Sequence, residues 1–331
     1  MRIVVLTESW PATDVPVVTA PEVARTVSEA WKATVADAVV EAFALGDGGA
    51  RSADALPGAR SAVGGAQVVD AGGSLVLTPA DGARRWEPHA LAAALLGLAA
   101  EHVHAVPSRT VVVPVGDESP AGDATDVWLG GLAQMRAATS VLDLVVAVGS
   151  QRPLLGFHGM SAALRDGRES DEAIGRAAQA QEERWALIAR EADPLAAQRS
   201  LLGSSRLSDQ PGTGAAGGLA YCLAALGGRL LPAAQILASL SGAEAAAEHA
   251  DLVVAVVPRL LPRTLDEGAV PAASALAART GVPAVILAPS TRIGRRDLMN
   301  AGVASAHEAT TGLDGLRQGV RRVAQTWSRR P

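Results

Sequence analysis

The chain alternates short apolar runs with longer amphipathic stretches. Five short runs near the two ends have the apolar or β-branched composition of buried parallel strands: residues 2–6, 38–45, 252–257, 284–288 and 303–307. Helical stretches fall between them, at residues 21–34, 52–59, 234–249, 265–280 and 315–327. This alternation favours a doubly wound α/β sheet with right-handed crossovers, and we expect the strands of both chain ends to share that sheet.

The middle of the chain repeats the alternation independently. Its strands are predicted at residues 66–71, 73–78, 109–115 and 144–148, and its helices around 87–105, 124–139 and 170–192. We therefore predict two α/β domains, one formed by residues 1–65 plus 232–331 and the other inserted as residues 66–231. Serine, proline and glycine punctuate residues 193–211, which makes them a candidate connector or lid.

Composition and charge argue against nucleic-acid and membrane partners. The net charge of -5 and the pI near 5.7 give no basic face for nucleic acid. The longest apolar runs, residues 90–100 and 214–228, fall short of a bilayer span, and the N-terminal apolar stretch ends at Glu8, which fits a first strand better than a signal peptide. These features predict a cytoplasmic protein without nucleic-acid or membrane partners.

Standard nucleotide and metal motifs are missing from the sequence. It contains neither GxxxxGK[ST] nor GxGxxG after a strand, and the pair His102 and His104 lacks a nearby third ligand for zinc. Cys222, the only cysteine, lies in an apolar helix and is read as a small core residue. Lys32 is the only lysine, and its place at the end of a helix is typical of a solvated residue.

Five motifs carry a family resemblance, in the order ESW at 8–10, GDGGARSADAL at 46–56, RPLLGFHGMSAAL at 152–164, GTGAAGGL at 212–219 and ADLVVAVVPRLLPRTL at 250–265. Together they resemble the glycerate kinase family of the bacterial 2-glycerate kinase type. The resemblance implies a flavodoxin-like doubly wound parallel sheet domain formed by both chain ends, with a second α/β domain inserted. It also implies phosphoryl transfer from ATP to glycerate with Mg²⁺.

The resemblance also nominates site residues. By their place in the motifs, Glu8, Asp47 and Arg259 are the catalytic candidates. The candidates for binding substrate or phosphate are Ser9, Gly48, Gly49, Ser52, Gly212, Thr213, Gly214, Gly217 and Thr264. Asp117 and Asp123, in an acidic loop, are the candidate magnesium ligands, and a merely hydrated loop is the alternative. The alternative for the motif glycines is a structural role, because tight turns and close packing also need residues without a side chain.

Several charged groups of the family pattern are replaced. Pro11 stands where the first motif has lysine, Gly268 where the fifth has lysine, and a deletion before Gly167 removes a third. Phosphoryl transfer needs positive charge at the transferring group, so arginines would have to substitute. Arg51, Arg259 and Arg263 are candidates. Arg292, Arg295 and Arg296 could meet a nucleotide phosphate, or could simply be solvated at the start of a helix.

Three hypotheses therefore stay open. The protein is a glycerate kinase using substitute groups, a kinase for another small hydroxy acid, or a catalytically inactive homologue that binds or regulates a partner such as an active paralogue. A homodimer is a further expectation for its assembly. Any surviving anion site is expected to involve residues 47–49, residues 212–218 and Arg259, whose chemistry rests on backbone amides or a guanidinium.

Overall fold

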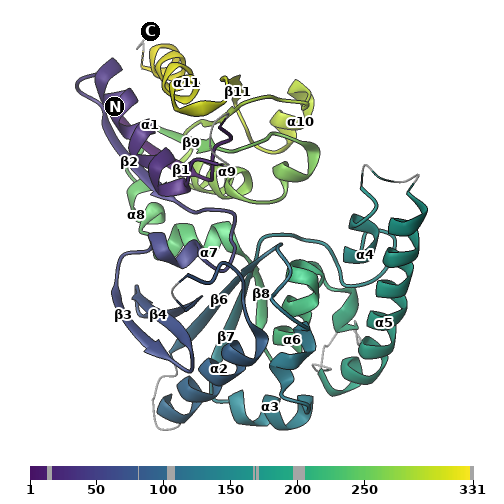
Figure 1. The fold of residues 1–331 in the computed structure, drawn as a ribbon. Helices are drawn as coiled ribbons and strands as arrows, with labels where there is room; N and C mark the ends of the chain where they lie inside the picture. Colours follow the sequence, from purple (N-terminus) through teal and green to yellow (C-terminus); the bar gives the residue numbers. More distant parts are fainter. Residues whose placement is uncertain are drawn as a thin grey trace. The chain divides into compact units, whose positions relative to one another are not determined.

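A computed structural model describes residues 1–12, 17–80, 82–102, 109–166, 168, 171–196 and 206–328 of the protein. The chain divides into two compact units, Met1–Asp47 with Ala234–Pro331 and Gly48–Ala233 (Figure 1). Both units are α/β. Within the described residues no helix has the length and apolar character needed to cross a membrane.

The first unit is built on a five-stranded sheet in which every neighbouring pair is parallel. Its strands are β1 (Arg2–Thr7), β2 (Val39–Ala44), β9 (Leu252–Val256), β10 (Ala284–Ala288) and β11 (Ser305–Glu308). Their order, β11-β10-β9-β1-β2, is the flavodoxin-like 2-1-3-4-5 order when strands are counted within the unit. Ile3 of β1 pairs with both Val40 and Leu252. The prediction that the two chain ends share one sheet is confirmed.

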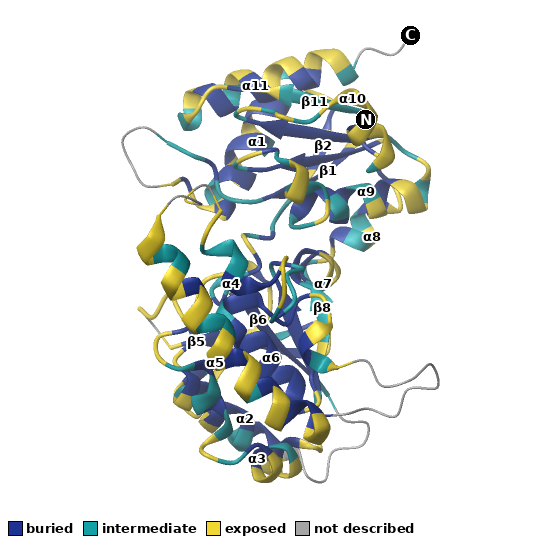
Figure 2. Cartoon of the chain, turned by 90° about the vertical axis from the view of Figure 1, so that its right-hand side faces the viewer, coloured by how far each residue is buried: buried dark blue, intermediate teal, exposed yellow. Residues whose placement is uncertain are grey.

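Amphipathic helices cover this sheet. The helices of the unit are α1 (Ala20–Thr34), α7 (Ala233–Leu240, which begins at the boundary), α8 (Ala243–Ala247), η5 (Pro262–Leu265), α9 (Ala269–Thr280), α10 (Arg295–Asn300) and α11 (Gly312–Trp327). Helix α11 alternates buried and exposed residues around its axis (Figure 2), as expected for a helix with one face on a core. Trp10 and Trp31 are fully buried among the apolar residues of β1, β9, α1 and α11. The helices therefore cover the sheet and leave its strand ends to the loops.

The second unit has a mixed six-stranded sheet in the order β3-β4-β5-β6-β7-β8. The strands are β3 (Ala59–Val63), β4 (Ala66–Ala71), β5 (Ser74–Pro79), β6 (Thr110–Gly116), β7 (Asp143–Val148) and β8 (Arg229–Pro232). β3, β4 and β5 are antiparallel, whereas β5 to β8 are parallel. β3 pairs with β4 and therefore belongs to the second unit, which begins at Gly48. The boundary expected at residue 65 differs from this one.

Helices α2 (Pro88–His102) and α6 (Leu219–Ala225) each contribute six buried residues to the core of this unit. The helices of the unit are η1 (Ser52–Ala55), α2 (Pro88–His102), η2 (Ala124–Trp128), α3 (Leu132–Thr139), α4 (Met160–Ala163), α5 (Glu172–Ala196), η3 (Leu207–Asp209), η4 (Ala215–Gly218) and α6 (Leu219–Ala225). The single helix expected at 124–139 is two, since Leu129 and Gly130 have φ of 49° and 81°. His104 and the central part of the candidate lid lie outside the described residues, and α5 extends to Ala196.

Candidate functional site

Glu8 lies at the C-terminal end of β1, beside β9, where the strand order of the first unit reverses. This is the position at which open α/β sheets bind their ligands. The Glu8 backbone N–H donates to the Val256 carbonyl at 2.9 Å, which fixes the residue between the two strand ends. Its carboxylate Oε1 accepts a 2.7 Å hydrogen bond from the N–H of Ala269, the first residue of α9.

The surroundings of Glu8 make its carboxyl group unusually basic. Burial raises the pKa of Glu8 to about 7, and the negative charge of Asp47 acts in the same direction. The bond from Ala269 opposes this shift because it favours the charged carboxylate. The result is a carboxyl group that exchanges its proton near neutral pH, as a general base for a hydroxyl group must.

Gly268 gives the Glu8 carboxylate room to reach α9. Its φ of 72° and ψ of −149° belong to a region that is essentially restricted to glycine. A Cβ atom at this position would overlap Glu8 Oε1. The sequence presents Gly268 only as the loss of a family lysine, whereas in the structure it is needed for the Glu8 contact.

Two loops extend the same edge of the first unit. After β9, Arg259 is exposed, and Leu260 forms an isolated parallel bridge with Thr291, which follows β10. The hydroxyl of Thr264 accepts from the Leu261 N–H at 2.9 Å and is 2.8 Å from the Leu261 carbonyl, so it caps η5. Ser9, next to Glu8, is half-buried. The structure thus places Glu8, Ser9, Asp47, Arg259 and Thr264 in the first unit.

Four glycines meet at the C-terminal ends of β6 and β7 in the second unit. A Cβ atom on Gly116 would lie 2.6 Å from the Cα of Gly49, and one on Gly48 would lie 3.5 Å from the Cα of Gly149. The N–H of Gly149 donates to the Gly116 carbonyl at 3.3 Å. We call Gly48, Gly49, Gly116 and Gly149 the glycine platform. Gly48 and Gly116 are buried, so the absence of side chains lets these backbone segments pack closely against one another.

Ser52 and Arg51, which follow the platform in sequence, have structural roles. The N–H of Ser52 donates to the Gly49 carbonyl at 2.9 Å, and Ser52 itself is buried. Arg51 pairs with Asp54 at 2.7 Å and donates to the Pro79 carbonyl at 3.0 Å. Arg51 is therefore held in place by this network, which weakens its candidacy as a substitute for a lysine.

Residues 212–218 pack closely against their neighbours. A Cβ atom would overlap the Pro153 carbonyl at Gly214, would approach Ser119 Oγ to 2.7 Å at Gly217, and would overlap the Trp185 ring at Gly218. Ala216, Gly217 and Gly218 all have positive φ, so the chain turns sharply before α6 begins at Leu219. Close packing accounts for these glycines, and their role in ligand binding stays a prediction.

Thr213 links two loops of the second unit. Its buried hydroxyl accepts from the Leu154 N–H at 2.9 Å and lies 2.7 Å from the Gln210 carbonyl, to which it can donate. We expect Thr213→Val to lower the free energy of unfolding by about 1–2 kcal/mol, because a buried N–H loses its acceptor. Urea unfolding measures the change, with exposed Thr326→Val as control. Unchanged stability together with weaker glycerate binding would instead assign the hydroxyl to a ligand.

The two predicted magnesium ligands differ in their surroundings. Asp123 caps η2 through the Thr125 N–H at 3.0 Å and forms an ion pair with Arg184, which lowers the pKa of Asp123. That carboxylate does not fit a metal site. Asp117 is exposed and directly follows Gly116, and its assignment as a magnesium ligand stays a prediction. In the part of the chain that the structure describes, no three His, Cys, Asp or Glu side chains cluster to hold a metal.

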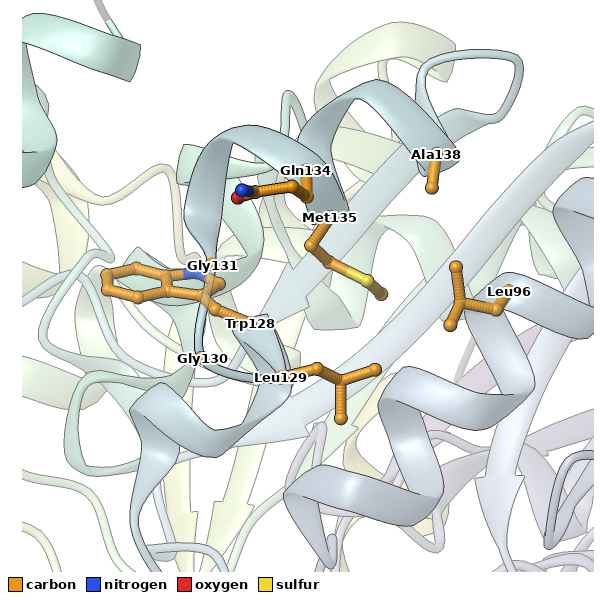
Figure 3. Close-up of a pocket in the computed structure, with 8 residues that line it drawn as sticks. All are labelled: Leu96, Trp128, Leu129, Gly130, Gly131, Gln134, Met135 and Ala138. Atoms are coloured by element: carbon orange, nitrogen blue, oxygen red, sulfur yellow. The ribbon is translucent and has the colours of Figure 1, made fainter.

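A pocket of about 420 Å³ opens beside α3 in the second unit (Figure 3). Leu96, Leu129 and Met135 line it together with Trp128, and Gln134 supplies its polar side chain. No ionisable residue lines it. Phosphoryl transfer needs charged groups around the reacting atoms, so this pocket does not fit that chemistry.

Some site features were not found from the sequence. Gly116 stands in an acidic loop that draws attention to its carboxylates, and Gly149 replaces a family side chain. Ala269 contributes only its backbone N–H, a group that almost every residue type has, so the sequence does not single out this position. The helix was predicted over residues 265–280, with Gly268 inside it, whereas α9 begins at Ala269. A glycine inside a helical pattern was the available signal for the helix terminus that Glu8 contacts.

The fold and these loops define an α/β protein whose polar and glycine-rich segments gather at the C-terminal ends of parallel strands, the arrangement typical of ligand-binding α/β proteins. The glycerate kinase family model matches residues 126–330, more than half of the chain. The chain belongs to the glycerate kinase family, as its motifs indicated.

Two uncharacterized mycobacterial proteins are similar to the chain: Mb2228c of Mycobacterium bovis (strain ATCC BAA-935 / AF2122/97) and MT2261 of Mycobacterium tuberculosis (strain CDC 1551 / Oshkosh). Each is 28% identical over 198 residues, which cover 59% of this chain and 49% of the relative. The chain thus spans about half the length of the curated relatives it matches.

One solved structure shares the fold along nearly the whole chain. It is the crystal structure of a Salmonella typhimurium LT2 protein provisionally assigned as glycerate kinase 2. The TM-score is 0.55 at 20% identity, with 99% of this chain and 98% of that chain covered. At this identity the likeness supports the α/β fold class and carries no residue roles.

Proposed function

We propose that the protein is a slow phosphotransferase that moves a phosphoryl group from ATP to a hydroxyl group of a small hydroxy acid such as glycerate. The observation that carries the proposal is Glu8, a carboxyl group with a pKa of about 7 at the ligand-binding edge of a parallel sheet. Family membership supports the substrate class.

In the proposed reaction Glu8 accepts the proton of the substrate hydroxyl. The hydroxyl oxygen forms a bond to the γ-phosphorus, the bond from that phosphorus to the bridging oxygen breaks, and ADP leaves. A general base of this kind contributes roughly 100- to 10,000-fold in rate. A magnesium ion would neutralise phosphate charge when bound.

Loss of the family lysines limits the rate. Lys32 is exposed at the end of α1, and Arg51 is engaged by Asp54, so neither fits a role at the transferring phosphate. A single charge-stabilising donor is worth on the order of 100-fold in rate. We therefore expect a turnover below about 0.1 per second, against about 10 per second for a typical enzyme.

Coupled measurement of ADP release with glycerate, ATP and Mg²⁺ tests this rate. A turnover near 10 per second would contradict the expected impairment. The second candidate function is a catalytically inactive homologue that binds a hydroxy acid or a partner protein. The internal engagement of Arg51, Thr213 and Asp123 favours it. Calorimetry with ATP and glycerate distinguishes the two, because binding without ADP release supports the inactive homologue.

A further inference from the structure

A polar pocket of about 710 Å³ lies between β11 and α11 in the first unit. β11 is the edge strand next to β10, and Figure 1 and Figure 2 both show α11 beside it. Small-molecule pockets measure about 300–1,000 Å³, so the size suits such a ligand. Six residues line the pocket: Ala306, His307 and Glu308 of β11, and Arg322, Gln325 and Thr326 of α11.

Arg322 and Glu308 bring opposite charges to this pocket without neutralising each other. Nη2 of Arg322 donates to the main-chain carbonyl of Glu308 at 2.6 Å, and Oε1 of Glu308 accepts from the Thr291 N–H at 2.8 Å. Among the described residues neither side chain takes part in an ion pair, whereas Arg317 of the same helix pairs with Asp314 at 2.9 Å. Both charged groups are thus held in place, and each keeps hydrogen-bonding capacity for a ligand.

His307 adds a neutral hydrogen-bond donor. The indole N–H of Trp327 can only donate, and it lies 3.3 Å from His307 Nε2, with Ser305 Oγ 3.0 Å from the same atom. Burial and the positive charge of Arg322 lower the pKa of His307, so the ring is neutral at pH 7. Nε2 is then the unprotonated nitrogen and Nδ1 carries the hydrogen. In the part of the chain that the structure describes, this N–H has no acceptor, so it is available to a ligand.

We propose that this pocket binds a free α-amino acid. A small anion would be repelled by the Glu308 carboxylate and a small cation by the Arg322 guanidinium, whereas a zwitterion satisfies both. The carboxylate of the amino acid accepts from Arg322 and from the Nδ1–H of His307, and its ammonium group donates to Glu308. Because contacts with the backbone already fix both protein charges, little side-chain freedom is lost on binding.

The pocket is separate from the surroundings of Glu8. In the sheet order, β10 and β9 lie between β11 and β1, the strand that leads into Glu8. Neighbouring strands are about 4.8 Å apart, so three such spacings separate β11 from β1. The amino acid is therefore an additional ligand, distinct from the hydroxy acid of the proposed reaction, and its binding does not depend on that reaction.

Calorimetric titration of the full chain at pH 7 with each of the protein-forming α-amino acids in turn tests the site. At least one of them should bind with a Kd below about 1 mM. Acetate and methylamine, which carry one charge each, are the matched controls and should bind at least about 10-fold more weakly. Glycerate has a carboxylate but no ammonium group, so it should not displace the amino acid.

Variants of the two charged residues locate the binding. Glu308→Gln keeps an acceptor for the Thr291 N–H but removes the negative charge, and Arg322→Gln removes the guanidinium group. Each should weaken amino-acid binding about 10- to 100-fold, the value of lost hydrogen bonds to a charged group. Arg321→Gln, at an exposed position of the same helix, is the control and should leave the affinity unchanged. Failure of every amino acid to bind, equal binding of acetate or methylamine, displacement by glycerate, or unchanged affinity in both charge variants would overturn the site.

Discussion

Glu8→Gln is expected to lower the turnover of phosphoryl transfer by about 100- to 10,000-fold, because the amide cannot accept the substrate proton. The wild-type rate should rise as pH passes through about 7, where Glu8 loses its proton, and the variant should lack this rise. Transfer of label from γ-phosphate-labelled ATP to glycerate measures both. The amide oxygen can still accept from Ala269, so the fold is preserved.

The same substitution should make the protein more stable at alkaline pH. The pKa of Glu8 is about 7 in the folded protein and 4.5 ordinarily, so the folded state holds the proton more tightly. Its contribution to stability is fully present below pH 4.5 and is lost as pH rises through about 7. At pH 8 the uncharged variant should gain on the order of 2 kcal/mol in free energy of unfolding over the wild type.

Lower activity together with higher stability is the outcome that identifies a functional carboxyl group, since a merely structural one would lose both. Glu41→Gln is the control, because Glu41 is an exposed glutamate on β2 of the same unit. Should Glu8→Gln leave turnover unchanged, the general-base role is wrong. Should it destabilise the protein at pH 8, the account of its burial is wrong.

Hydrophobic patterning predicted the sheet of the first unit because its strands are apolar and buried. All five residues of β9 and of β10 are buried, which is why both appear as apolar runs. β3 was missed because four of its five residues are exposed, and the edge strand β8 was missed because none of its residues is buried. Edge strands pair through backbone atoms, and their side chains need not follow an apolar pattern.

The family motif led to Glu8, but the sequence around Glu8 does not show which group donates a hydrogen bond to its carboxylate. Ala269 lies 261 residues further along the chain and contributes a backbone group. Thr213 and Thr264 illustrate the opposite case. Their motifs suggest ligand binding, yet their hydroxyls already bond to nearby backbone atoms, and a motif does not show whether a hydroxyl is engaged.

Gly268→Ala is expected to lower the free energy of unfolding by about 2–4 kcal/mol. The φ and ψ of Gly268 are strained for any residue with a Cβ, and the added methyl group overlaps the Glu8 carboxylate, which must then leave Ala269. Because the displaced carboxyl group is the proposed base, turnover should also fall. Denaturant unfolding and phosphoryl transfer measured on the same preparation give both values.

Gly281→Ala, at the other end of α9, is the matched control. Gly281 has a φ of 71°, but a Cβ atom there would meet no atom within 4 Å. It should lose about 1 kcal/mol from backbone strain alone and keep its turnover. If the two variants lose the same stability and the same activity, the contact between Glu8 and α9 adds nothing beyond glycine strain. A larger loss at Gly268, restored in part by Glu8→Ala in the double variant, would show that the methyl group and the carboxylate compete for one space, because removing the carboxylate then relieves the clash.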